Sequence, residues 1–247
     1  LGDRAVAIGK NALTAQNFTS TTDNYNVAIG YSAGSSIQTG TNNTLVGGLA
    51  GDALNIGSYN IAIGYSALGS EDSRGRAVAV GYNALATQNA DADSYNTAVG
   101  FEAGKAVTTG TNNTLIGGLA GDAITTGSLN TALGYNSLGA NTTASHVTAV
   151  GNAALTANTT GTRNTAVGSE AADAINTGQD NTAIGSLALS ADTKGNYSTA
   201  IGRGALKLQN FTSSTSAHNT AVGYSAGESV TTGTNNTFVG GLAGDGT

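Results

Sequence analysis

The sequence predicts an all-β fold, a β-solenoid of about 14 coils with a 17-residue period, and three observations support this. First, the phrase Asn-Thr-Ala-Val/Ile-Gly recurs along the chain, and 17 residues separate its glycines in ten of thirteen intervals. Second, the residues before each glycine are β-branched or alanine, and β-branched residues favour strands. Third, the residues between the phrases are mostly Gly, Asn, Thr and Ser, which favour turns.

The glycine that ends each phrase, called the key glycine, gives the repeat units a common numbering in which position −1 precedes it. The key glycines are Gly9, Gly30, Gly47, Gly64, Gly81, Gly100, Gly117, Gly134, Gly151, Gly168, Gly185, Gly202, Gly223 and Gly240. Three intervals are longer, with 21, 19 and 21 residues. Because insertions in a solenoid usually project from one face, we expect contact surfaces near residues 14–25, 85–95 and 206–218, although tolerated decoration explains them equally well.

Each unit is expected to contain one short strand that ends at its key glycine, such as residues 96–99 before Gly100. Side chains alternate across a strand, so Thr97 and Val99 share one face and Ala98 lies on the other. Both faces are apolar or small, which predicts that both are covered, one by the solenoid's interior and the other by a second wall or a sister chain. We expect one buried Val or Ile per coil to contribute roughly 1.5–3 kcal/mol before entropy is subtracted.

The segment after each strand is expected to form turns, as in residues 108–113. Position −4 is Asn in ten of the 14 units. Repeated coil after coil, this residue predicts stacked side-chain amides that satisfy buried turn groups. The alternative interpretation is a solvated turn asparagine.

Three units differ from the others in a correlated way. Position −2 becomes large, and position +1, elsewhere often Tyr or Phe, becomes Gly. The pairs are Leu45 with Gly48, Leu115 with Gly118, and Phe238 with Gly241. Close packing predicts such an exchange of volume within one coil.

The composition argues against several functional classes. Of the 247 residues 10% are charged, with a net charge of −6, and the repeat units carry no basic stripe, so nucleic-acid binding is not expected. No run of 18 apolar residues predicts a membrane-spanning helix. The chain has no methionine, so Leu1 is not a translational start. We expect residues 1–247 to be one continuous repeat array and a fragment of a longer fibre protein.

Motifs that resemble ion and phosphate sites are interpreted as parts of the repeat. Residues 47–52, 117–122 and 240–245 look like calcium-binding glycine-aspartate repeats, but Asp52 and Asp122 are four coils apart, too far to share an ion within one chain. Three chains meeting on an axis would bring three equivalent aspartates together, which is a weaker alternative. Residues 100–105 are one residue short of a phosphate-binding loop.

Candidate catalytic groups are isolated in the sequence. His146 and His218 sit in turns before strands, far apart and without ligand partners at the right spacing. Glu71 and Asp72 form one local pair in a turn, not carboxylates on adjacent coils as a glycan-cleaving solenoid needs. We therefore predict no enzyme and no catalytic, cofactor-binding or metal residues. An ice-binding face is not favoured, because the threonines share their face with apolar residues.

Residues 26–33 (Asn-Val-Ala-Ile-Gly-Tyr-Ser-Ala) and 60–67 (Asn-Ile-Ala-Ile-Gly-Tyr-Ser-Ala) resemble the head repeats of YadA-like trimeric autotransporter adhesins. Similar Asn-Thr-Ala-Val-Gly-Tyr arrays occur in bacteriophage tail fibres. The resemblance covers essentially the whole chain and implies a left-handed parallel β-roll, three identical chains side by side as a homotrimer, and a role in attachment. The 17-residue step and the large inserts depart from the adhesin pattern, and the adhesin's stalk and membrane anchor are not in this sequence.

The expected function is that of a non-enzymatic structural and adhesive fibre segment, a phage tail or virion fibre shaft that attaches to a host or another surface. The alternatives are the head of a bacterial trimeric autotransporter adhesin and an ice- or ion-binding β-solenoid. The expected partners are the chain itself, as a homotrimer, and a host-surface receptor or glycan at the three inserts. We expect no nucleic acid, no membrane contact in this segment, and an extracellular location on a virion or cell-surface appendage.

Overall fold

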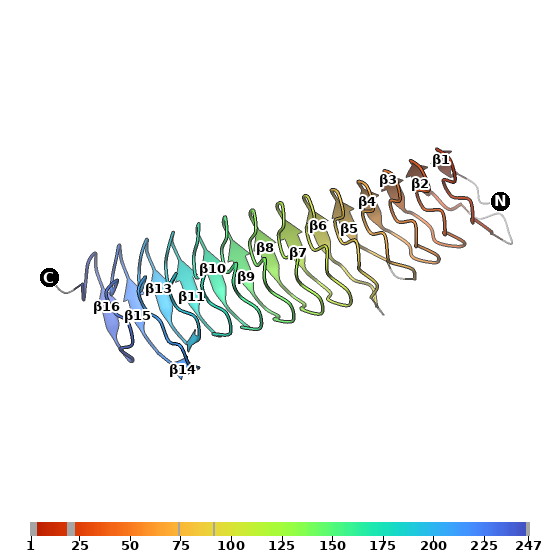
Figure 1. Cartoon of the computed structure of the whole chain (residues 1–247). Helices are drawn as coiled ribbons and strands as arrows, with labels where there is room; N and C mark the ends of the chain where they lie inside the picture. Colours follow the sequence, from red (N-terminus) through yellow and green to blue (C-terminus); the bar gives the residue numbers. More distant parts are fainter. Residues whose placement is uncertain (1–3, 19–22, 74, 91, 246–247) are drawn as a thin grey trace. The chain divides into compact units, whose positions relative to one another are not determined.

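A computed structural model describes residues 4–18, 23–73, 75–90 and 92–245. Over these residues the chain is a parallel β-solenoid of about 13 turns with a 17-residue period, and it contains no helix. The ribbon shows a short strand followed by a long loop as the element that repeats from coil to coil (Figure 1). The all-β prediction and the predicted period are confirmed.

The chain divides into two compact units, Leu1–Gly127 and Ser128–Thr247. The strands of the first unit are β1 (Val6–Ile8), β2 (Val27–Ile29), β3 (Thr44–Val46), β4 (Ile61–Ile63), β5 (Val78–Val80), β6 (Thr97–Val99) and β7 (Thr114–Ile116). Those of the second are β8 (Thr131–Leu133), β9 (Thr148–Val150), β10 (Thr165–Val167), β11 (Thr182–Ile184), β12 (Gly195–Asn196), β13 (Thr199–Ile201), β14 (Thr215–Ser216), β15 (Thr220–Val222) and β16 (Thr237–Val239).

Strands of successive coils pair in parallel and in strict register. In the first unit Val99 of β6 pairs with Ile116 of β7, so these residues are vertical neighbours, as the period predicts. The long intervals keep this register, since Val6 of β1 pairs with Val27 of β2 across the first insert. The third insert adds its own short pair, β12 with β14.

The strands turn their alanines inward and their branched residues outward. Ala98 is fully buried, whereas Val99 is 36% exposed. The predicted alternation is confirmed, but the expected burial of one Val or Ile per coil is wrong for the strands, because the branched residues at position −1 are all partly or largely exposed. The interior beside the strands is narrow enough for alanine to fill it, and the larger buried side chains come mainly from the loops. The largest fully buried side chains are Ile37, Leu45, Leu54, Leu68, Leu85, Leu115, Ile124, Leu138, Leu155, Ile175, Leu189 and Leu206.

Loop positions +4 and +7 share the filling of the interior. Where position +4 is Leu, position +7 is polar, as in Leu85 with Gln88. Where position +4 is Gly, position +7 is aliphatic in the coils that the structure describes through position +7, as in Gly104 with Val107. Most coils thus place one large apolar loop residue in the core, as close packing of a fixed volume requires.

Leu45 and Leu115 belong to coils that have Gly at position +4. A Cβ added at Gly51 would lie 2.8 Å from Leu45 Cδ2, and one added at Gly121 would lie 2.8 Å from Leu115 Cδ2. The volume that Leu45 gains is therefore balanced inside the core and not at Gly48, whose Cβ would meet only the Tyr65 ring, at 3.5 Å. The predicted exchange of volume between positions −2 and +1 is wrong, because position +1 lies on the outer edge of the coil.

The key glycines are required by the stacking of the coils. Gly47 has a φ of 135°, and a Cβ there would lie 2.5 Å from the carbonyl oxygen of Gly64 in the next coil. Only glycine accepts both this conformation and this close approach.

The asparagines at position −4 form a buried ladder. Asn43 is fully buried, and its Nδ2 donates to the carbonyl oxygen of Gly57 at 2.9 Å. Its Oδ1 accepts from the backbone N–H of Asn60 at 3.0 Å, while its own N–H donates to Asn26 Oδ1 at 3.0 Å. The predicted stacking of buried amides is confirmed, and the solvated interpretation is wrong.

Candidate functional site

Each unit presents an exposed apolar surface along its strands, called here the strand face. It consists of the side chains at positions −3 and −1, which point outward, and successive strands repeat it about every 4.8 Å. Its exposed aliphatic residues are Val6, Ile8, Ile29, Ile61, Ile63 and Val99 in the first unit and Leu133, Val167, Ile184, Val222 and Val239 in the second. Threonines at position −3 alternate with them in most coils.

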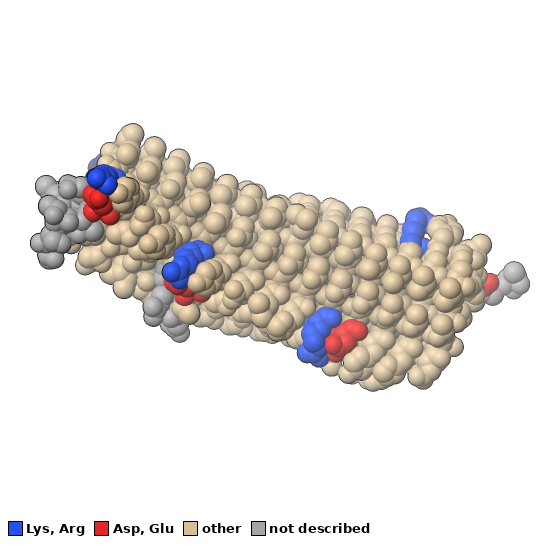
Figure 2. Space-filling view, turned by 180° about the vertical axis from the view of Figure 1, so that it is seen from behind, with Lys and Arg blue, Asp and Glu red and all other residues tan. Residues whose placement is uncertain are grey.

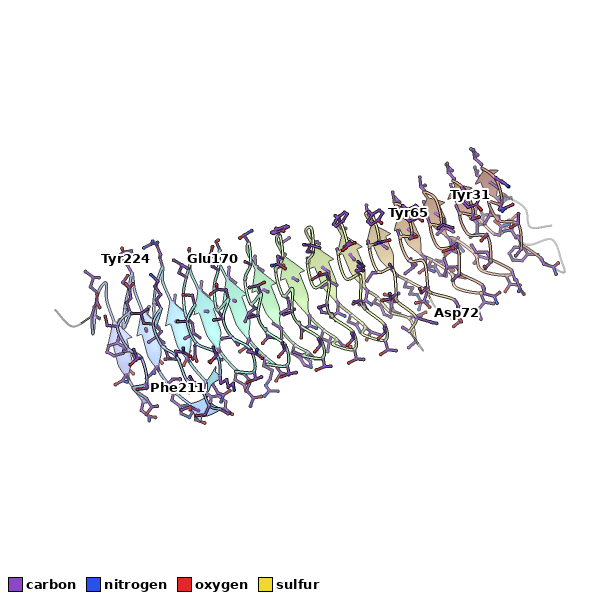
Figure 3. All side chains as sticks on the ribbon, viewed as in Figure 1. Tyr31, Tyr65, Asp72, Glu170, Phe211 and Tyr224 are labelled. Carbon is purple, nitrogen blue, oxygen red and sulfur yellow. The ribbon has the colours of Figure 1, made fainter. Side chains whose placement is uncertain are left out.

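An aromatic edge follows the strand face at position +1. In the first unit Tyr65, Tyr82 and Phe101 form a stack, with ring centroids 5.7 and 5.3 Å apart. All three rings remain about half exposed. Figure 3 shows Tyr31 and Tyr65 along one edge of the first unit and Asp72 at the opposite edge.

In the second unit position +1 is aromatic at Tyr135 and Tyr224, both more than half exposed, and Asn, Ser or Arg occupies it in the coils between them. Figure 3 places Tyr224 and Glu170 on the edge opposite Phe211 in this unit. Monomeric proteins rarely expose contiguous apolar patches larger than a few hundred Å². The strand face and aromatic edge are therefore the strongest candidates for a protein–protein interface.

A second surface runs along position −5, where the loop enters the strand; we call it the corner column. Its members all have positive φ, for example Tyr59 (63°) and Arg76 (64°). The key glycine and the strand positions each repeat one or a few residue types, whereas this position varies. The column contains Arg4, Tyr25, Asn42, Tyr59, Arg76, Tyr95, Asn112, Leu129, His146, Arg163, Asp180, Tyr197, His218 and Asn235.

Residues of the corner column in the first unit interact from coil to coil. The Arg76 guanidinium lies between two rings, 5.9 Å from the centroid of Tyr59 and 5.6 Å from that of Tyr95. It also donates to Tyr95 Oη at 3.0 Å and pairs with Asp93. A hollow of about 180 Å³ opens beside this cluster.

The corner column of the second unit contains an ion pair and a ring stack. Arg163 donates to both oxygens of Asp180, at 2.6 and 2.9 Å. This hydrogen bonding raises the pKa of Arg163 and lowers that of Asp180. Farther along, Tyr197 stacks on His218 with centroids 5.0 Å apart. Charged side chains are sparse on the face shown in Figure 2, and several of the basic groups lie directly beside acidic ones.

The insert near residues 85–95 is anchored by a buried polar network that sequence reasoning missed. Gln88 Nε2 donates to Glu71 Oε2 at 3.0 Å and to Ser94 Oγ at 3.1 Å, and Gln88 Oε1 accepts from Asn96 Nδ2 at 2.8 Å. Glu71, Gln88, Ser94 and Asn96 are fully buried. The available signal was the glutamine at position +7 of each coil that carries an insert, Gln16, Gln88 and Gln209.

The insert near residues 206–218 repeats this network. Gln209 Nε2 donates to Asp192 Oδ2 at 2.7 Å and to Ser198 Oγ at 2.9 Å, and Gln209 Oε1 accepts from Asn219 Nδ2 at 2.8 Å. Phe211 is also buried, so this insert is partly core. Of the other two inserts, residues 19–22 and 91 lie outside the described residues.

The candidate residues for ion or phosphate binding do not lie close together in the structure. Asp52 and Asp122 occupy the same position, +5, in coils of β3 and β7, and burial raises the pKa of both. Lys105 pairs with Glu102 of its own turn at 3.0 Å. Within the described part of the chain, no three His, Cys, Asp or Glu side chains cluster in a way that could hold a metal ion.

The candidate catalytic residues also do not form a common site. Glu71 is buried in the insert network, and the Asp72 backbone carbonyl accepts from Asn55 at 2.6 Å. His146 and His218 lie in turns before β9 and β15, as predicted, but the contact of His218 with Tyr197 was not. Among the residues described, no helix is long and apolar enough to cross a membrane.

In comparisons with models of protein families, with curated proteins and with solved structures, the chain matches none of them.

Proposed function

We propose that the chain is a structural and adhesive fibre segment, without enzymatic activity, that assembles as a homotrimer through its strand face. In this proposal three left-handed β-rolls lie side by side with their strand faces toward one another. The corner column and the inserts stay on the outside, where they contact a host surface. The location is extracellular, on a virion or cell-surface appendage.

The observation that carries the proposal is the outward direction of the branched residues. Val99 and Val167 are each 36% exposed, and Ile184 is 39% exposed, although alanine beside them is fully buried. A chain that worked alone would gain solubility from polar residues at these positions. The strand face of a second copy of the chain is equally flat and has the same repeat distance. It can therefore cover all the exposed branched residues of the strand face together.

Charge also favours self-association along this face. Positions −3 and −1 carry Val, Ile, Leu or Thr in every unit and no charged residue. Absence of charge from the centre of a patch is typical of the cores of protein–protein interfaces. The ion pairs instead involve the corner column and the loops, for example Arg163 with Asp180 and Lys207 with Glu228.

The molar mass of the particle in solution tests the proposal. We expect light scattering after size exclusion to give three times the chain mass of 24.1 kDa. Replacing Val99 and Val167 together by Lys places one charge on the strand face of each unit and should yield folded monomers. The matched control replaces Leu129 and Tyr197 by Lys on the corner column and should remain trimeric. A monomeric wild type, or a strand-face variant that stays trimeric, would contradict the proposal.

The same assembly would serve a phage tail or virion fibre and the head of a bacterial adhesin. We propose the fibre, because the turns at 39–44 and 109–114 (Thr-Gly-Thr-Asn-Asn-Thr) resemble those of phage fibre arrays.

Ice binding is the second candidate because the threonine-bearing face points outward, although aliphatic residues on the same face interrupt its hydroxyl groups. Thr97 and Val99 lie side by side on the strand face, and the coils of β7 to β11 repeat this Thr-x-aliphatic pair. A regular array of hydroxyl and methyl groups on a flat face can order water. Thermal hysteresis by a monomeric wild-type chain would support this candidate; freezing without hysteresis would exclude it.

A further inference from the structure

The hollow of about 180 Å³ in the first unit combines one exposed ring, that of Tyr59, with a pair of opposite charges. Tyr59 comes from the corner before β4, Arg76 from the corner before β5, and Asp93 from the insert before β6. The hydroxyl-bearing residues Ser58 and Ser73 complete the polar lining. Three successive coils thus contribute to one concave surface, so the site is built by stacking and not by a single loop.

Arg76 is held in place on two sides. Its guanidinium donates to Tyr95 Oη at 3.0 Å, pairs with Asp93, and lies over the rings of both Tyr59 and Tyr95. Tyr59 is 59% exposed and Tyr95 54% exposed, so both rings stay accessible to a ligand. The positive φ of all three corner residues repeats from coil to coil and points their side chains in the same direction.

The charge balance of the hollow selects among ligands. Because Asp93 pairs with Arg76, neither an anion nor a cation gains a full opposite charge there. What remains is a set of charge-assisted hydrogen-bond donors and acceptors beside an aromatic ring. That combination suits a neutral ring with one apolar face and several hydroxyl groups.

We propose that the hollow lined by Tyr59, Arg76 and Asp93 binds a neutral pyranose, one sugar unit of a surface glycan. The C–H face of the sugar stacks on the Tyr59 ring, and vicinal hydroxyls hydrogen-bond to the Arg76 guanidinium and the Asp93 carboxylate. Pockets for drug-sized ligands are about 300–1,000 Å³, so a hollow of about 180 Å³ takes a single ring. The glycan ligand rests on the attachment role proposed above, but the site itself lies within one chain.

The first insert repeats the chemistry of this cluster. Arg4 pairs with Asp23 at 2.7 Å and lies over the Tyr25 ring, 5.5 Å from its centroid. In both inserts an arginine on one coil meets an Asp-x-Tyr segment at the end of the insert, although the two intervals differ in length. This recurrence indicates that the inserts position Asp and Tyr against the arginine of the preceding coil.

Titration of the full-length chain with single sugars tests the site. The probes are methyl β-glucopyranoside, methyl β-galactopyranoside, methyl α-mannopyranoside and N-acetylglucosamine, with inorganic phosphate and N-acetylneuraminic acid as charged competitors; binding is followed by saturation-transfer NMR. We expect at least one neutral probe to bind with a Kd on the order of 1–10 mM, which is the range for a ligand of this size. Tyr59→Ala and Arg76→Gln should each weaken that binding at least fivefold.

Tyr197→Ala is the matched control, because it removes a corner-column tyrosine outside the hollow, and its affinity should equal that of the wild type. Thermal melting of every variant verifies that it is folded. The proposal is overturned if no neutral probe binds at about 20 mM, if neither site variant weakens binding, or if phosphate or the acidic sugar binds more tightly than every neutral probe. The Val99→Lys, Val167→Lys variant should keep the sugar affinity even as a monomer, which separates failure of this site from failure of the trimer.

Discussion

The Leu45 side chain fills the space beside Gly34: a Cβ built on Gly34 would lie 2.7 Å from Leu45 Cδ1. The backbone does not by itself require glycine there. Gly34 has a φ of 58°, and Leu68 and Leu85 adopt nearly the same φ, 53° and 49°, at the equivalent position of their coils. Competition for core volume therefore decides which residue stands at position +4.

A double-mutant cycle at these two residues tests the competition for volume. Gly34→Ala should lower the free energy of unfolding by about 1–3 kcal/mol through overpacking. Leu45→Ala should lower it by about 2–5 kcal/mol through a cavity. The double variant should lose clearly less than the sum, because each change relieves the other. Urea denaturation measures all three, and Gly48→Ala on the outer edge serves as the neutral control. Simple additivity would show that the two sites do not share space.

Burial of a charge at the interior alanine of position +3 should prevent folding. Ala103 is fully buried, so Ala103→Glu places an unpaired carboxylate in the core and should cost at least about 3 kcal/mol. Thr109→Glu, six residues away on an exposed turn, is the control and should change little. Circular dichroism melting compares the two. Equal melting temperatures would mean that position +3 is not interior.

The sequence is sufficient to predict the period, the strands, their register and the buried amides, because each of these follows from repetition itself. It does not predict which strand face points inward. Ala98 and Val99 are both acceptable core residues, and only the width of the coil, which loop residues such as Leu85 set, decides between them. Neither the two-residue period of a strand nor the 3.6-residue period of a helix identifies Leu85 as a core residue, because Leu85 lies in a turn with positive φ.

The corner cluster is also hard to predict from sequence. Arg76 and Tyr95 are 19 residues apart in the sequence and meet only because the insert preserves the coil register. The recurring Asp-x-Tyr at residues 23–25 and 93–95 was the available signal. The length of the interval alone predicts a contact surface on the insert, whereas the Tyr59 ring of the proposed sugar site belongs to a coil corner.

Replacement of Asn43 in the buried amide ladder should destabilise the chain more than replacement of its exposed neighbour Asn42. Asn43→Ala leaves the partners of Asn43, including the Gly57 carbonyl and the Asn60 N–H, without their side-chain hydrogen bonds. Buried groups left unpaired cost about 1–3 kcal/mol each, so the unfolding midpoint in urea should fall substantially. Asn42→Gly, which keeps the positive φ at an exposed site, should be near neutral. A neutral Asn43→Ala would contradict the ladder's role.

Deletion of a whole coil should be tolerated, whereas deletion of half a coil should not. Deleting residues 148–164 joins Val147 to Thr165 and brings β8 against β10 in the register that β9 had. Deleting only residues 148–155 shifts every later residue relative to its vertical neighbour and misplaces the interior side chains. Circular dichroism and melting should show a folded chain for the first deletion only. Similar behaviour of the two deletions would refute the solenoid period.

Three aspartates at position +5 should make the chain less stable as the pH rises. Burial, the largest cause, raises the pKa of Asp52, Asp122 and Asp173 above the ordinary value of 3.8, and Asp173 Oδ1 is buried without a hydrogen-bond partner. A raised pKa means that the folded chain holds these protons more tightly than the unfolded chain does. This contribution to stability is therefore complete below about pH 3.8 and is lost as the pH rises through the folded pKa values.

Replacing these three aspartates by Asn keeps the uncharged form at every pH. The triple variant should melt at a higher temperature than the wild type at pH 7, and the difference should shrink at pH 3. Asp180→Asn should behave in the opposite way, because hydrogen bonding from Arg163 lowers the pKa of Asp180 and its contribution is present only above its unfolded pKa. That variant should melt below the wild type at pH 7 and approach it as the pH falls. Shifts of the same sign for both variants would show that burial does not control the aspartates at position +5.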